Sequence, residues 1–161
     1  MQNIIDNYKD RLGQLTGLQC SGVAGTAGVG SMITLMFGTS FTRIISCVRE
    51  PFSYEDSDTA LCLEFAAWRL RRGEESLCSS STPNGPGSKM ETSLSNLKGL
   101  TVIGVDLNEG SFDLAITFSN EFVFSIFCDQ FDTGNENYSF RCKGERFTVG
   151  CGPKLMLEAE K

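Results

Sequence analysis

Histidine is absent from this chain of 161 residues, and so are Cys-x-x-Cys pairs and long apolar runs. The lack of histidine excludes Ser-His and Cys-His nucleophile arrangements, histidine metal ligands, and the side chain that most often acts as a base near neutral pH. No apolar stretch approaches the ~20 residues that a membrane helix needs. We therefore expect no catalytic residues, no metal site, no cofactor and no membrane partner.

The seven cysteines are an odd number, and most lie within apolar strand patterns, at positions 20, 47, 62, 78, 128, 142 and 151. Free buried thiols in a reducing compartment fit this distribution better than a disulfide framework does. The N-terminus has neither the basic region nor the apolar region of a secretory signal. We therefore expect a soluble cytoplasmic protein.

Positive charge is in short supply, because 14 basic side chains face 20 acidic ones and the net charge is -6. Binding to nucleic acid depends on Lys and Arg neutralising phosphates, so this balance argues against direct nucleic-acid binding. An acidic surface instead attracts a basic partner protein. The alternative is that the charge serves only solubility.

Ile4, Ile5, Tyr8, Leu12 and Leu15 recur at helical spacing near the N-terminus. Such spacing places apolar side chains on one face of a helix. We therefore expect an N-terminal helix within residues 1–16 that packs on a sheet.

Two regions, residues 17–79 and 97–151, repeat one order of features, which indicates an internal duplication. Leu15-Thr-Gly-Leu18 introduces the first region, and Leu97-Lys-Gly-Leu100 opens the second. The matching extended segments are Ser21–Gly30 and Thr101–Asn108, and the alternating strands that follow are Ile33–Phe37 and Leu114–Phe118. Third apolar strands follow at Leu61–Phe65 and Phe122–Phe127.

Each region then ends in a hairpin signal. Trp68-Arg-Leu-Arg71 followed by Gly73-Glu74 matches Tyr138-Ser-Phe-Arg141 followed by Gly144-Glu145. A strand that reaches a glycine turn and returns is typical of a β-hairpin. A tryptophan between arginines could anchor a partner, but the match favours a core position for Trp68.

Between the two regions, residues 80–96 form a serine- and proline-rich linker with a short helix, for which Ser88 and Glu91 have capping-box spacing. Residues 152–161 are expected to be a C-terminal tail. The fold class that follows is α+β and mostly antiparallel β. One domain, residues 1–161, contains two repeated units of about four strands packed as two sheets.

Gly22–Gly30 is rich in glycine and invites comparison with a phosphate-binding loop. Such a loop ends in Lys-Ser/Thr and leads into a helix, whereas here a strand pattern follows and no lysine is near. Cys142 and Cys151 lack the clustered partners of a zinc site. We interpret both features as structural.

Carboxylates cluster in two segments that we expect to be loops, with Glu55, Asp56 and Asp58 in one and Asp129, Asp132 and Glu136 in the other. Three interpretations remain open: a solvated surface, a contact surface for a basic partner, and a pair of catalytic carboxylates. No calcium-loop spacing occurs. These six residues are our candidate partner-binding residues. An irregular insertion at about residues 51–57 occurs only in the first region, and segments that interrupt a repeat often carry function.

The order of motifs resembles that of small bacterial immunity proteins of contact-dependent growth inhibition and related polymorphic toxin systems. The residues that carry the resemblance are Leu15–Leu18, Phe37-Gly38, Trp68-Arg69-Leu70, Ser79-Ser80-Ser81, Leu97–Leu100 and Tyr138-Ser139-Phe140. The resemblance implies a protein that binds and neutralises the C-terminal toxin domain of a delivered effector, often a basic nuclease. The duplicated order also looks like the whirly architecture, whose members bind single-stranded DNA through a lysine-glycine motif that is absent here. Whirly-like nucleic-acid binding and a small carboxylate hydrolase are the alternatives.

Overall fold

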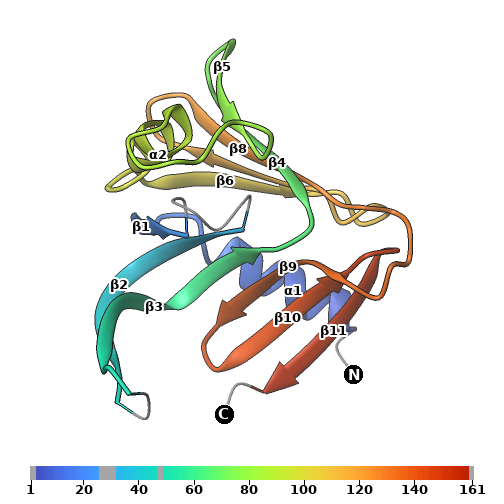
Figure 1. Ribbon diagram of the computed structural model, residues 1–161. Coiled ribbons are helices and arrows are strands. Elements are labelled where there is room, and N and C mark those ends of the chain that lie inside the picture. Colours follow the sequence, from blue (N-terminus) through green and yellow to red (C-terminus); the bar gives the residue numbers. More distant parts are fainter. Residues whose placement is uncertain (1–2, 26–31, 47–48, 160–161) are drawn as a thin grey trace.

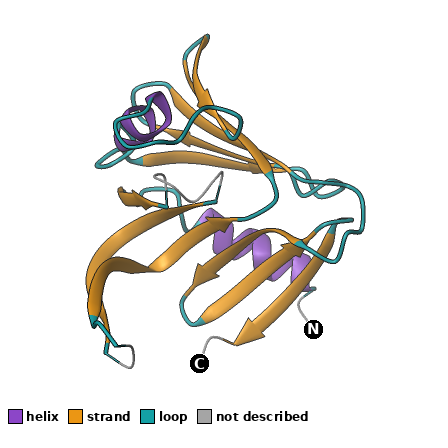
Figure 2. Cartoon of the chain, viewed as in Figure 1, coloured by secondary structure: helices purple, strands orange, loops and turns teal. Residues whose placement is uncertain are grey.

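A computed structural model describes residues 3–25, 32–46 and 49–159, which form two antiparallel sheets and two helices (Figures 1 and 2). The first half of the chain contains α1 (Ile4–Gly13), β1 (Cys20–Ala24), β2 (Ile33–Ile45), β3 (Phe52–Leu63), β4 (Ala67–Arg72) and β5 (Glu75–Ser79). The second half contains α2 (Lys89–Ser95), β6 (Val102–Leu107), β7 (Leu114–Phe118), β8 (Phe122–Phe127), β9 (Glu136–Cys142), β10 (Glu145–Gly150) and β11 (Lys154–Ala159). The predicted fold class is confirmed, with five strands from each repeat and β11 in addition.

The two sheets do not correspond to the two repeats. One sheet has six strands in the order β1-β2-β3-β9-β10-β11, and the other has five in the order β5-β4-β8-β7-β6. Each sheet therefore combines a three-stranded meander from one repeat with the terminal hairpin of the other. The repeats exchange hairpins, so neither is a separate layer, and the sequence did not predict this exchange.

The strand registers support the alignment of the two repeats. In the first sheet Leu63 lies opposite Tyr138, and in the second Ile126 lies opposite Trp68. Trp68 and Tyr138 thus occupy equivalent places, as the sequence predicts. The turns differ by one position from our alignment, because the structure matches Gly73 with Lys143 rather than with Gly144. Gly73 and Lys143 are the first turn residues of their hairpins, and both have positive φ, at 55° and 52°.

The Leu-x-Gly-Leu motifs meet at a local two-fold relation between the repeats. An isolated antiparallel bridge joins Gln19 to Thr101, which are equivalent positions of the two copies. The surrounding hydrogen bonds run from Gly17 N to Val102 O, Gly99 N to Cys20 O, Cys20 N to Leu100 O and Val102 N to Leu18 O, at 2.7 to 2.8 Å. The first two bonds are equivalent when the two copies are exchanged, and so are the last two. The two motifs therefore connect the two sheets through backbone hydrogen bonds.

One apolar core lies between the sheets. The rings of the equivalent residues Phe37 and Phe118 stack with centroids 6.4 Å apart and an interplanar angle of 9°. Trp68 is 1% exposed and stacks on Phe124, so its predicted core position is confirmed. Both phenylalanines that close the alternating strands thus lie at the centre of the shared interior.

Both helices bridge the two sheets, and both end just before a Leu-x-Gly-Leu motif. α1 contacts β11 and β6, whereas α2 contacts β5 and β1. The Ser88 side chain caps α2 by accepting a hydrogen bond from Glu91 N at 3.2 Å. The Glu91 carboxylate accepts from Gly87 N at 2.7 Å, one residue earlier than the capping box that the sequence predicts.

Residues 152–161, which we expected to be a tail, contain β11, which pairs with β10 along its whole length. The glycine-rich segment begins as β1, and its residues 26–30 lie outside the described residues. The next described element is strand β2, as the sequence predicts, rather than the helix of a phosphate-binding loop. Within the described ranges, no helix is long and apolar enough to span a membrane.

Candidate partner-binding surface

The β2–β3 hairpin continues well beyond the strands on either side of it. β1 pairs with β2 only as far as Phe37, and β9 pairs with β3 only between Ala60 and Leu63. Residues 40–45 and 52–57 pair with each other outside these limits and form a two-stranded ribbon, which we call the arm. Figure 1 shows the arm at the lower left, curving away from β9 and β10.

The arm has no counterpart in the second repeat. There β7 ends at Phe118 and β8 begins at Phe122, so the same two strands are joined by a tight turn in which Asn120 and Glu121 have positive φ. In the first repeat a bulge between Phe37 and Ser40 bends the hairpin where the arm begins. An insertion that only one of two similar repeats carries is a natural place for a function specific to this protein.

Strand alternation divides the arm between two faces. Paired residues point to the same side of a ribbon, and successive residues point to opposite sides. One face, which we call the aromatic face, consists of Phe41, Arg43, Ile45, Phe52, Tyr54 and Asp56. The other face is mostly polar and consists of Ser40, Thr42, Ile44, Ser53, Glu55 and Ser57.

The aromatic face presents large apolar side chains to solvent. Phe52 is 54% exposed, Tyr54 is 43% exposed, and their rings lie 6.2 Å apart. The Arg43 guanidinium lies over the Phe41 ring at 5.3 Å from its centroid. Ile44 on the polar face is 71% exposed. Aromatic and arginine side chains in such clusters are the residues most often found at the centre of protein interfaces.

Asp56 fixes the base of the arm. Its carboxylate accepts a hydrogen bond from Arg43 Nε at 2.6 Å and another from the Arg141 guanidinium of β9. The Ser57 backbone N–H donates to the same carboxylate at 2.8 Å, and Arg141 also donates to Ser57 O at 2.7 Å. Burial raises the pKa of Asp56, but these hydrogen bonds outweigh it and hold the pKa below its ordinary value.

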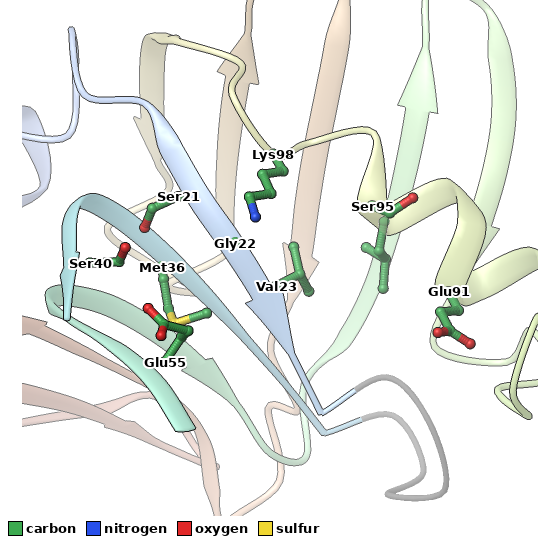
Figure 3. Close-up of a pocket in the computed structure, with 10 residues that line it drawn as sticks. Ser21, Gly22, Val23, Met36, Ser40, Glu55, Glu91, Ser95 and Lys98 are labelled. Carbon is green, nitrogen blue, oxygen red and sulfur yellow. The ribbon is translucent and has the colours of Figure 1, made fainter. Parts of the chain in front are cut away.

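A groove of about 450 Å³ lies beside the arm, between the β1–β2 pair and the segment containing α2 (Figure 3). Val23, Met36 and Leu94 provide its apolar lining. The polar residues around them are Ser21, Ser40, Glu55, Glu91, Ser95 and Lys98. Figure 3 shows Lys98 extending toward β1. The polar face of the arm therefore borders a concave surface, to which Glu55 contributes a carboxylate.

The structure corrects the predicted loop at Glu55, Asp56 and Asp58, because all three lie within strand β3. A run of polar residues suggested a loop, but the opposite strand supplies a backbone partner at each position of the arm. Asp56 is 6% exposed and carries the ion pairs just described. Glu55 and Asp58 are exposed, and Glu55 accepts a hydrogen bond from Thr42 at 2.9 Å.

The second acidic group lies at the other end of the shared sheet. Asp129 and Asp132 are in the β8–β9 connection, and Glu136 is the first residue of β9. Asp132 forms an ion pair with Lys154, and Oε2 of Glu136 lies 3.5 Å from Nη2 of Arg146. β9 runs from this group toward the base of the arm, so the structure does not bring the two acidic groups together.

Cysteine thiols are further groups with reactive chemistry. The six cysteines at positions 20, 62, 78, 128, 142 and 151 are free, and all but the half-buried Cys62 are buried, while Cys47 lies outside the described residues. Burial raises the pKa of Cys20 and Cys78 to about 11. Across the part of the chain that is described, no group of three Cys, Asp or Glu residues could hold a metal ion.

No family model, curated protein or solved structure matches this chain. The candidate surface is therefore defined by the shape and the exposed side chains of the arm and the groove. Sequence reasoning selected Glu55 and noted the insertion at residues 51–57, but it missed Ile44, Phe52 and Tyr54. The signal for these three residues was an apolar and aromatic pattern within an insertion that only one repeat carries.

Proposed function

We propose that this protein is an immunity protein that binds a toxin domain through the arm and the groove at its base. The observation that carries the proposal is the arm itself, a protruding ribbon that exposes Ile44, Phe52 and Tyr54. Single exposed apolar residues are common on soluble proteins, but aromatic residues grouped on one projecting element mark interaction sites.

Preorganisation of the arm supports protein binding. The ribbon is held by cross-strand pairs along its length, and Asp56 ties it to β9 through Arg141. A surface that is ordered before binding loses less conformational entropy when the partner arrives. The arm is therefore suited to enter a concave site on a partner, as an inhibitor of an enzyme would.

Charge supports a basic partner. The net charge of the chain is -6, and Glu55 and Asp58 are exposed on or beside the arm. The active-site grooves of nucleases carry lysine and arginine side chains that bind phosphates, and carboxylates can bind the same cations. A nuclease toxin is thus the class of partner that fits this surface. The association rate should fall as salt rises if these carboxylates contribute.

The direct test is co-expression with the toxin domain of an effector encoded directly upstream. Under the proposal, cells that express the toxin alone stop growing, and cells that also express this protein grow and yield a stable complex of the two. Expression of an unrelated toxin domain is the control and should not be rescued. The proposal fails if the neighbouring toxin is not neutralised and no complex forms.

A whirly-like nucleic-acid binder is the second candidate, and one feature favours it. The Arg69 guanidinium lies over the exposed Phe127 ring at 5.8 Å from its centroid, on the five-stranded sheet. Arginine and aromatic side chains together can stack on unpaired bases. Titration with single-stranded oligonucleotides separates the two functions, because an immunity protein should show no tight binding at physiological salt.

A further inference from the structure

The outer edge of β11 is open. β11 is the last strand of the six-stranded sheet, and among residues 3–25, 32–46 and 49–159 no strand pairs with its far side. Its residues are exposed except for the half-buried Leu155, and Met156 and Leu157 are 46% and 40% exposed. An apolar strand edge with unpaired N–H and C=O groups is a template for another strand.

The sequence of β11 is complementary to itself. It reads Lys154-Leu-Met-Leu-Glu158, with a cation at one end, an anion at the other and three apolar residues between them. Two copies that pair antiparallel about a two-fold axis bring unlike ends together. The same strand in a parallel arrangement would place like charges side by side, which is unfavourable.

Ladder geometry restricts the register. In an antiparallel strand each residue points its N–H and C=O to one neighbouring strand, and the next residue points them to the other. Two residues can therefore lie opposite each other only if both point these groups toward the shared seam or both point them away from it. A two-fold axis must then pass beside one residue of each strand. With Met156 on the axis, Lys154 faces Glu158 of the second copy at both ends of the contact. Axes at Leu155 or Leu157 lose both of these charge pairs.

We propose that the protein forms a homodimer by antiparallel pairing of β11 with β11 of a second copy, with Met156 on the two-fold axis. Leu155 and Leu157 of the two copies face each other across the seam. The six-stranded sheets join into one continuous sheet, and the interface is isologous. β11 and the arm lie toward opposite edges of this sheet, so both arms stay accessible to partners.

The test is a charge-exchange series followed by sedimentation analysis of the full chain. Wild type is expected to approach twice the monomer mass of 17.6 kDa, with a Kd on the order of 10 µM because a strand-edge interface is small. Lys154→Glu and Glu158→Lys each place like charges at both ends of the seam. Each should weaken dimerisation by about tenfold or more, and the double variant should restore it.

Asp132→Asn is the matched control, because Lys154 also pairs with Asp132 within the chain. That variant removes the internal ion pair, leaves the strand edge unchanged and should dimerise as wild type does. A wild type that stays monomeric at every concentration overturns the proposal. A dimer that both charge reversals leave intact overturns it as well, and so does a double variant that remains as weak as the single ones. None of these outcomes depends on the arm or on toxin binding.

Discussion

Replacing Phe52 and Tyr54 together with serine is expected to weaken binding to the toxin domain about a hundredfold. The centroids of the two rings lie 6.2 Å apart, and both residues are about half exposed to solvent. Truncation of an aromatic residue in an interface that costs about 1.4 kcal/mol at each position gives about 2.7 kcal/mol for the pair, which corresponds to a hundredfold change in Kd. Calorimetric titration of the purified toxin domain measures the change.

The matched control for this pair is Phe65→Ser. Phe65 is 61% exposed, comparable to Phe52, but lies between β3 and β4 away from the arm. This variant should bind as wild type does. Both variants should retain the wild-type circular dichroism spectrum and unfolding midpoint, because neither touches the core. Equal loss of binding in both would contradict a contact confined to the arm.

Asp56→Asn is expected to lower the free energy of unfolding by about 2 kcal/mol at pH 7. The change removes the charge that faces Arg43 and Arg141 and weakens the hydrogen bonds that both guanidinium groups donate to this side chain. Denaturant titration measures the loss. Asp58→Asn is the control, because this neighbouring carboxylate is exposed, and it should change stability by no more than about 0.5 kcal/mol.

Acidic pH should reduce the difference between wild type and Asp56→Asn. The pKa of Asp56 is lower in the folded protein than its ordinary value of 3.8, so the ionised form stabilises the fold above that pH. This contribution is lost as the pH falls through the folded-state pKa. The two proteins should therefore differ by a constant amount from pH 7 to about pH 5 and converge below about pH 4. A difference independent of pH would show that the charge of Asp56 is not its source.

The sequence predicted the buried faces of strands and the start of a helix well because these depend on local patterns. Alternation at Ile33–Phe37 and Leu114–Phe118 marked the core side of each strand, and Ser88 marked the start of α2. The exchange of hairpins could not be predicted in this way. Alternation tells which side of a strand is buried, but the choice between two similar neighbours depends on the whole assembly.

The candidate site was less accessible to sequence reasoning. Glu55, Asp56 and Asp58 resemble loop residues because their neighbours are polar, and only pairing with residues 40–45 makes the segment a strand. The short run Leu155–Leu157 near the end of the chain looked like part of a tail, although it is paired with β10. Both errors concern strands whose stability comes from a partner strand rather than from their own pattern.

The arm and β11 are two places where the second repeat does not mirror the first, and the β8–β9 connection at residues 128–135, which is longer than the β3–β4 connection at residues 64–66, is another. The remainder, from the helices to the hairpins, is a symmetric scaffold around Phe37 and Phe118. We propose that the arm binds the partner and that β11 mediates self-association.

Hydrogen exchange of the protein with and without the toxin domain tests partner binding by the arm most directly. The prediction is that backbone amides of residues 40–45 and 52–57 slow strongly on binding, with weaker protection along the groove at Val23 and Leu94. Amides of the β8–β9 connection should exchange at unchanged rates. Protection at that connection, or over the five-stranded sheet, with no change in the arm would contradict the proposed function.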